Sequence, residues 1–211
     1  MLRGNRNVSI AETIHSYIKG GEKVLIAIDA PLGWPQNLGI FLQGHKAGGN
    51  LNIDAHNLFR RETDKFVKRK IGKQSLDVGA DRIARTAYAA LAIINDLRYM
   101  TNSEISLAWD KNFNEKVSVI EVYPAATLIS YGIPSSGYKE KNQHNARREI
   151  INEVVHYVQK SCDLSKAEQD ANILDSIICI LAAKDFLTGK VHYPESLEVA
   201  KKEGWIWIKS Q

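Results

Sequence analysis

The pattern of apolar and polar positions near the start of the chain predicts a helix followed by a buried strand. Residues 9–19 carry apolar side chains at helical spacing, after a capping box formed by Ser9 and Glu12. Residues 24–28 are a continuous apolar run bounded by turn residues, which is typical of a strand covered on both faces of a sheet. Prolines and a glycine stop this strand just after Asp29. We therefore expect Asp29 at the carboxyl end of a buried strand, where open α/β sheets usually keep their ligands.

Further patterns of the same kind predict an α/β layered domain. After a glycine-rich loop over 36–52, the expected elements are helices over 54–72 and 78–100, strands over 105–109 and 117–123, a helix over 147–160, a helix from 165 that contains 173–183, and a last strand over 205–208. Helices that alternate with strands in this way cover the faces of a sheet. The length of 211 residues fits a single domain over residues 1–211.

Composition and charge place the chain among ordinary globular proteins. Hydrophobic residues make up 44% and charged residues 25%, which are average values and argue against disorder or a coiled coil. The net charge of +4, from 28 basic and 24 acidic residues, permits an anionic partner such as nucleic acid without requiring one. Two cysteines cannot form a disulfide framework, and neither a signal-peptide stretch nor an apolar run of membrane-spanning length occurs. We expect a cytoplasmic protein with no membrane partner.

Several common catalytic signatures do not occur in the sequence. The six histidines are scattered, without the HxH or HExxH patterns of zinc enzymes. Walker A, GxGxxG and GxSxG motifs are also missing, which removes the usual signs of nucleotide-binding folds and serine hydrolases. The candidate chemistry therefore lies with carboxylates.

Two carboxylates stand in apolar surroundings, where an unpaired charge costs several kcal/mol. Asp175 interrupts an almost wholly apolar helix, whose neighbouring positions leave no solvated stripe. We expect it either to bind a hard cation such as Mg²⁺ near the carboxyl ends of the strands or to hydrogen-bond a group inside the core. Asp29 either contributes to such a site or accepts hydrogen bonds from the backbone N–H groups of the turn that follows it.

Glu121 and Asp64 have structural interpretations beside the functional ones. Glu121 lies within a predicted strand, and it either joins an acidic site, faces solvent or forms a salt bridge with an arginine, namely Arg60, Arg61 or Arg82. Asp64 follows Arg60 by four residues, so the two fit a helix-surface ion pair of about 0.3–0.5 kcal/mol. The same grouping would suit a phosphodiester held near a metal. Periodicity does not distinguish these alternatives.

Five short segments of the chain occur in the order that marks a known family. They are IDAPLG at residues 28–33, RETD at 61–64, IEVYPA at 120–125, LDSI at 174–177 and EGWIW at 203–207. These segments resemble the motifs of domain-of-unknown-function family 429, and the resemblance extends over nearly the whole chain. That family is described as predicted nucleases with a ribonuclease H-like fold.

The resemblance implies a metal-dependent nuclease and assigns roles to acidic and basic residues. Enzymes of this fold gather carboxylates around two divalent cations, Mg²⁺ or Mn²⁺, which activate water and stabilise the leaving oxygen. The acids carried over by motif are Asp29, Asp64, Glu121 and Asp175. Of these, Asp29 and Asp175 would be the main cation ligands and the other two accessory acids. The residues expected to contact phosphate are Arg60, Arg61 and Lys139.

The start of the chain departs from the pattern of the implied fold. Ribonuclease H-like sheets begin with a three-strand meander whose first strand supplies an essential aspartate, whereas nothing before Ser9 could form a strand of normal length. We therefore expect a mixed sheet, flanked by helices, that lacks the first strands of the meander. Its open edge would invite pairing with another chain and could support a dimer.

Three functions remain open from the sequence. A metal-dependent nuclease predicts cation-dependent cleavage of nucleic acid. A catalytically inactive member of the fold, binding nucleic acid or protein, predicts salt-dependent binding without turnover. A phosphotransferase of the related actin-like fold has little support, since no glycine-rich phosphate loop follows a first strand here.

Overall fold

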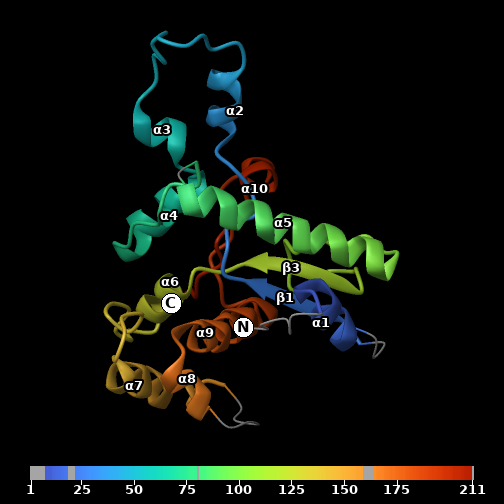
Figure 1. Cartoon of the computed structure of the whole chain (residues 1–211), viewed down its shortest axis with the longest axis vertical. Coiled ribbons are helices and arrows are strands. Elements are labelled where there is room, and N and C mark those ends of the chain that lie inside the picture. The colour runs from blue at the N-terminus through green and yellow to red at the C-terminus, as the bar shows by residue number, and fades with distance from the viewer. Residues whose placement is uncertain (1–7, 19–21, 80, 159–163, 211) are drawn as a thin grey trace.

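A three-stranded sheet forms the centre of the protein (Figure 1). The computed structural model describes residues 8–18, 22–79, 81–158 and 164–210. The strands are β1 (Val24–Ile28), β2 (Ser106–Leu107) and β3 (Val117–Glu121), in the order β1-β3-β2. The predicted α/β architecture is confirmed. The expectation of a mixed sheet is wrong for these strands, because both pairings are parallel.

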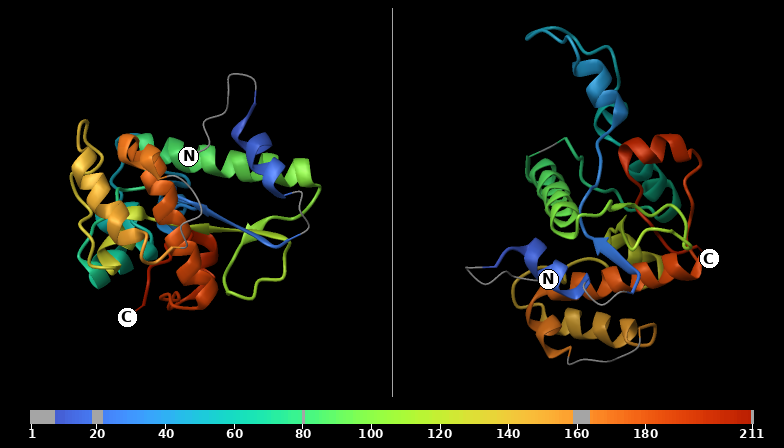
Figure 2. Two further views of the ribbon diagram at one scale, coloured as in Figure 1. Left: turned by 90° about the horizontal axis from the view of Figure 1, so that it is seen from below. Right: turned by 90° about the vertical axis from the view of Figure 1, so that its right-hand side faces the viewer.

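Helices cover both faces of the sheet. They are α1 (Ile10–Ile18), α2 (Gln36–Leu42), α3 (Ala55–Phe59), α4 (Glu62–Ile71), α5 (Asp81–Thr101), α6 (Pro124–Ser130), α7 (His144–Val154), α8 (Ser165–Gln169), α9 (Ala171–Thr188) and α10 (Leu197–Glu203). α1 and α5 cover one face, where Ile94 and Val119 share an apolar cluster. α9 covers the other face, where Cys179 packs in a cluster with Ala27. Figure 2 shows α5 and α9 on opposite sides of β1.

The capping and length of two helices agree with the sequence pattern. The Ser9 hydroxyl accepts a hydrogen bond from the Glu12 N–H at 3.1 Å, and the Glu12 carboxylate accepts one from the Ser9 N–H, so the predicted capping box is confirmed. α5 lies close to the helix expected over 78–100. None of the helices within the described ranges is long and apolar enough to cross a membrane.

Two predicted helices are each broken in two. The helix expected over 54–72 stops at Arg60, where the backbone is extended (φ −113°, ψ 132°), and α4 begins two residues later. The helix expected from 165 onward stops at Asp170, which is also extended, and the Asp170 carboxylate accepts the Asn172 N–H to start α9. Extended residues at these junctions turn each second helix in a new direction.

Two further boundaries differ from the expectation. α2 forms within the predicted loop, because a distant carboxylate, that of Glu203, accepts the Gln36 N–H at 2.8 Å and so caps the helix start. α7 begins at His144 rather than 147 and ends at Val154. Residues 159 and 160, the end of the helix expected there, lie outside the described residues.

The strand expected over 205–208 makes only isolated bridges. Ile206 pairs in parallel with Glu121, and the antiparallel bridge between Val191 and Lys209 lies just beyond the segment. Glu121 is the last residue of β3, so the segment meets the sheet at its end rather than along its length. Its side chains nevertheless enter the core, as Trp207 is 1% exposed.

β1 has one unpaired edge within the described part of the chain. The Val24 N–H donates to the Lys116 carbonyl and the Ile28 carbonyl accepts from the Val122 N–H, both at 2.9 Å. Because main-chain groups alternate along a strand, those of Leu25 and Ala27 point to the other edge. A cavity of about 580 Å³ lies along that edge, lined by α1, α5 and α9. β1 is therefore only half-buried, less covered than the sequence predicted. The oligomeric state stays a prediction.

Candidate active site

Asp29 lies directly after β1 and has a free carboxylate. No described residue forms a hydrogen bond or ion pair with its side chain. The alternative that Asp29 caps the following turn is not what the structure shows, because Glu121 accepts the Leu32 N–H of that turn at 2.9 Å. Asp29 is thus left available to a ligand at the carboxyl end of the strand.

Asp175 lies in α9 with both carboxylate oxygens engaged. The residue is 6% exposed. Its Oδ1 accepts a hydrogen bond from the Tyr138 hydroxyl at 2.6 Å, and its Oδ2 lies 2.7 Å from the Lys139 ammonium. Asp29 and Asp175 line the same cavity along the β1 edge, and their charges act on each other. The two acids that the sequence selected in distant segments therefore converge on one place.

Asp29 holds its proton more tightly than an ordinary aspartate. Removal from bulk water by the surrounding protein is the main cause, and the negative charge of Asp175 adds to it, whereas the positive charge of Lys139 opposes it. Together they raise the pKa of Asp29 to about 6. The side chain is nevertheless open to the solvent of the cavities, so a water molecule or an ion can reach it.

We expect Asp29→Asn to stabilise the protein near neutral pH. A carboxyl with a pKa of about 6 when folded, against an ordinary 3.8, favours the folded state when protonated, so its contribution is lost as pH rises from about 4 to about 6. Because water reaches Asp29, the expected gain at about pH 8 is only about 1 kcal/mol. Urea denaturation at about pH 4, 6 and 8 measures it. A difference between the two proteins that does not change with pH would contradict the prediction.

The loop that carries Tyr138 and Lys139 is fixed by a buried arginine. Arg147, 3% exposed, donates to the carbonyl of Tyr138 at 2.6 Å and to that of Glu140 at 3.2 Å. Its Nε donates to the Glu168 carbonyl at 2.7 Å, which ties the loop to α8 as well. Sequence reasoning selected Lys139 but missed Tyr138 and Arg147, since nothing in a polar loop marks a contact with a helix far along the chain.

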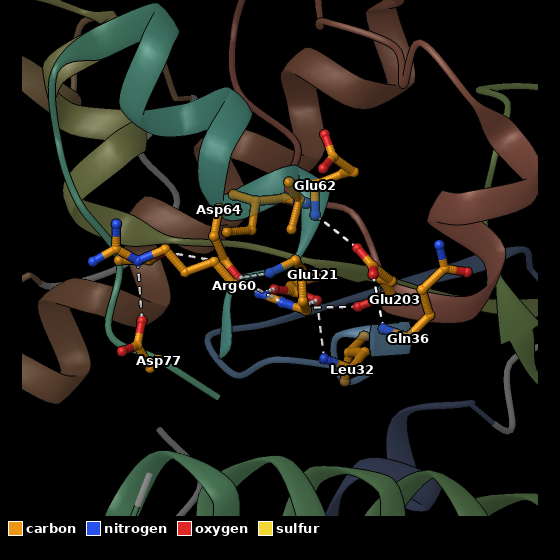
Figure 3. A network of polar contacts seen from close by, with 12 residues as sticks. Leu32, Gln36, Arg60, Glu62, Asp64, Asp77, Glu121 and Glu203 are labelled. Atoms are coloured by element: carbon orange, nitrogen blue, oxygen red, sulfur yellow. Dashed lines mark hydrogen bonds and ion pairs between the residues drawn. The ribbon is translucent and has the colours of Figure 1, made fainter. Parts of the chain in front are cut away.

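Asp64 and Glu121, both labelled in Figure 3, are held in a buried cluster around Arg61. Arg61 is 1% exposed, and it binds Glu121 with two N–H groups at 2.8 and 2.9 Å. Two more N–H groups bind Asp64 at 3.0 Å each, and the fifth binds the Glu203 carbonyl at 3.1 Å. All five donors of the guanidinium are therefore used. Of the alternatives for Glu121, the salt bridge with Arg61 is the one that the structure shows.

The Arg61 cluster also organises helix ends. The Asp64 carboxylate accepts the Arg61 N–H at 3.0 Å at the start of α4. The Glu203 carboxylate accepts two N–H groups, that of Gln36 at 2.8 Å and that of Glu62 at 2.7 Å, which begin α2 and α4. Carboxylates at helix starts satisfy N–H groups that have no partner within the helix.

Two glycines allow the backbone to close around the Arg61 cluster. A Cβ on Gly33 would lie 2.6 Å from the Glu203 carbonyl, and a Cβ on Gly204 would lie 2.7 Å from Glu121 Oε2. Gly204 also has a positive φ of 85°, which disfavours other residues. Four of the five motif segments contribute to this cluster, so their main visible role is to hold the fold together.

We expect Gly33→Ala to destabilise the protein by about 1–3 kcal/mol, the usual range for an overpacked position. The methyl group would meet main-chain atoms of Glu203, which cannot rotate away as a side chain could. Gly39→Ala is the matched control, since a Cβ at Gly39 meets no atom within 4 Å and alanine favours the α2 helix. Urea denaturation compares them, and equal effects of the two substitutions would count against the prediction.

The three residues expected to contact phosphate lie in different surroundings. Lys139 lies beside Asp175. Arg60 pairs with Asp77 at 3.2 Å, and not with Asp64, because the helix breaks between them. Arg61 has no donor left for a phosphate, because all five are used within the cluster.

A second cavity, also of about 580 Å³, opens at Asp29, which lines both this cavity and the one along the β1 edge. Its wall carries cationic and hydroxyl groups from three segments, including Lys73, Ser75, Ser135 and Lys139. Such groups bind phosphate oxygens through charge and hydrogen bonds. The cavity therefore suits an anionic ligand held next to the carboxylate of Asp29 and the ammonium of Lys139.

The number of available carboxylates limits how a divalent cation could be held. Within the described ranges, no group of three or more His, Cys, Asp and Glu side chains could hold a metal ion. Asp29 and Asp175 remain as a pair, since Asp64 and Glu121 are bound by Arg61. Mg²⁺ and Mn²⁺ are often held by one or two carboxylates with water and substrate oxygens, whereas structural zinc sites need four protein ligands. The donor set thus fits one Mg²⁺ or Mn²⁺ ion rather than two.

Comparison with known proteins gives a family but no activity. No curated protein and no solved structure matches the chain. One family model, described as protein of unknown function (DUF429), matches residues 2–198, which is nearly the whole chain. The protein therefore belongs to the DUF429 family.

Proposed function

We propose that this protein is a metal-dependent phosphodiesterase that cleaves nucleic acid. The observation that supports the proposal best is the convergence of Asp29, at a strand end, with Asp175, on a helix, beside a cavity lined by lysines. Carboxylates bring a hard cation to that place and lysines bring a phosphate. A phosphodiester is a substrate that uses both.

The residues of the site have distinct parts in the proposed reaction. Asp29 and Asp175 hold a divalent cation, which supplies Lewis-acid activation of the phosphate and of an attacking water when it is bound. Tyr138 orients Asp175 through its hydrogen bond to Oδ1. Lys73 and Lys139, on the wall of the cavity, bind the phosphate oxygens and offset the charge that grows during cleavage.

A ribonuclease H-like arrangement is part of the same proposal. It is supported by an acid at the carboxyl end of a parallel strand together with an acid from a long helix on one face of the sheet. The described sheet has three strands, with β1 at an edge. The first-strand aspartate expected of such folds is not among the residues that form this site.

Hydrolysis of defined substrates tests the proposal. Short labelled DNA and RNA oligonucleotides, single- and double-stranded, are incubated with the protein and Mg²⁺ or Mn²⁺. We expect cleavage that depends on the cation and stops when EDTA is added. No cleavage of any of these substrates, under conditions in which Mn²⁺ binding is demonstrated, would overturn the proposed activity.

A second function, nucleic-acid binding without catalysis, is favoured by the small number of free acids. Arg61 binds two of the four implied carboxylates, and Lys139 binds a third. This alternative predicts affinity for labelled oligonucleotides that falls steeply with KCl concentration and no product with either metal. Fluorescence anisotropy over a salt series, with the same samples checked for cleavage, separates the two functions.

A further inference from the structure

The two oxygens of Asp175 are held by groups of very different mobility. Oδ1 accepts from the hydroxyl of Tyr138, which is 1% exposed and packed in an apolar cluster. Oδ2 is held by the ammonium of Lys139, whose side chain is 57% exposed. A lysine side chain has a flexible stem and is readily rearranged in water, whereas a buried tyrosine is not. Only Oδ2 can therefore be released at small cost.

The backbone on both sides of Lys139 is fixed, so the side chain moves alone. Arg147 holds the carbonyls of Tyr138 and Glu140, which flank Lys139 directly. The Glu140 N–H donates to the Gly137 carbonyl at 3.1 Å, which closes a turn around these residues. Any displacement of the ammonium therefore occurs by rotation of the side chain into the cavity that it already lines.

One ammonium serves two carboxylates in this site. Lys139 pairs directly with Asp175, and its charge also acts on Asp29. Asp29 has no hydrogen-bond or ion-pair partner among the described residues. A cation that binds both acids must take an oxygen of Asp175, and Oδ2 is the one with an exchangeable partner.

We infer that Lys139 is a built-in counter-ion of the Asp29 and Asp175 pair, which a divalent cation displaces and which then binds the substrate phosphate in the adjoining cavity. The first step concerns metal binding alone. The second step rests on the proposed phosphodiesterase function. Lys139 thereby offsets part of the negative charge of the two carboxylates when the cation is not bound, and it becomes available to the phosphate only when the cation is in place.

The inference predicts that loss of Lys139 changes the affinity for a metal ion more than loss of another lysine of the same loop does. Without Lys139, the cation no longer competes with an ion pair, so Lys139→Met should bind Mn²⁺ about 3- to 10-fold more tightly than the wild type. Lys141→Met is the matched control, because it removes the same charge from the same loop and Lys141 is exposed. We expect its Mn²⁺ affinity to stay close to that of the wild type. Asp175→Asn should lose most of the binding.

Isothermal titration calorimetry with Mn²⁺ on the full chain and these three variants provides the test. Tightening in Lys139→Met alone supports the inference, and hydrolysis that is weakened by a higher KM in that variant supports its second step. Equal tightening in both lysine variants, or weaker binding in Lys139→Met, overturns it. Unchanged binding in Asp175→Asn also overturns it, because the cation would then lie elsewhere.

The same experiment separates this inference from the proposed function. If Lys139→Met tightens Mn²⁺ binding while no variant and no wild-type sample cleaves DNA or RNA, the counter-ion step stands and the phosphodiesterase proposal fails. If the wild type and Lys139→Met both bind no Mn²⁺, the inference and the metal-dependent mechanism fail together. If cleavage requires the cation but the wild type and Lys139→Met bind Mn²⁺ equally well, the proposed function stands and the inference fails.

Discussion

Replacement of Arg61 by leucine should destabilise the protein by about 3–5 kcal/mol, because it leaves the buried carboxylates of Asp64 and Glu121 without a partner. Such a loss is a large part of the 5–15 kcal/mol that typically stabilises a folded protein, so low yield or partial unfolding at 37 °C is the expected phenotype. The free energy of unfolding from urea denaturation gives the size of the effect where the variant still folds. Where the variant is too unstable to purify, a lower melting temperature in crude extract detects the effect.

Two substitutions serve as controls for Arg61→Leu. Arg60→Leu removes the neighbouring arginine, whose pair with Asp77 is partly exposed, and should cost no more than about 1 kcal/mol. Arg61→Lys keeps the charge but cannot supply five fixed donors, so its stability should lie between that of the wild type and that of Arg61→Leu. Similar losses in the Arg60 and Arg61 leucine variants would show that the cluster has no special role.

Asp175→Asn should reduce metal-dependent cleavage by more than about 100-fold, since even residues that only support a metal ligand change activity by about 10- to 100-fold. Asparagine has nearly the same shape and still accepts the Tyr138 hydrogen bond, so the fold should be retained. The substitution removes the negative charge that pairs with Lys139 and that would bind the cation. Steady-state rates with Mn²⁺ over a range of metal concentrations measure the effect as kcat/KM.

Asp54→Asn is the matched control for Asp175→Asn. Asp54 caps α3, where its carboxylate accepts from the N–H groups of His56 and Asn57. Asparagine is an equally good cap, so both stability and cleavage should stay near the wild-type values. A rate that is unaffected by Asp175→Asn would remove this residue from the reaction and with it the site that we propose.

Local sequence patterns were sufficient to bring out Asp29 and Asp175. Asp29 is marked by a five-residue apolar run that stops at prolines, and this fixes its place at the end of a strand. Asp175 is marked by its apolar neighbours in α9. Parallel strands end at one edge of a sheet, and a helix packed on the sheet passes near that edge, so the two positions were expected to meet. Their roles as cation ligands stay a prediction.

The Arg61 cluster could not be predicted in the same way. The apolar periodicity over 54–72 continues through Arg60 and Arg61, and the break there is made by partners far along the chain. Glu121 is 60 residues from Arg61, and the Glu203 carbonyl is 142 residues away. A local window contains no record of such contacts, so Arg60 and Asp64 looked like a helix-surface pair.

The contacts of the Tyr138 loop were hidden for a similar reason. Its contact with Asp175 spans 37 residues, and Arg147, which holds the loop, reads in the sequence as an ordinary polar position at the start of an amphipathic helix. Charged residues are almost never fully buried unless paired, and the pairing partner here is a set of backbone carbonyls. Backbone carbonyls are identical at every residue and leave no trace in a sequence.

The segment that follows the family match completes the Arg61 cluster and the core. The family match stops at residue 198, but Glu203, which caps two helices, comes after it, and so does Trp207, which packs edge-on against Phe186. A protein truncated at the limit of the family match would expose Arg61 and an apolar core at the same time. Shortened versions of this chain should therefore extend through Ile208, because the C-terminal segment is an internal part of the core rather than a tail.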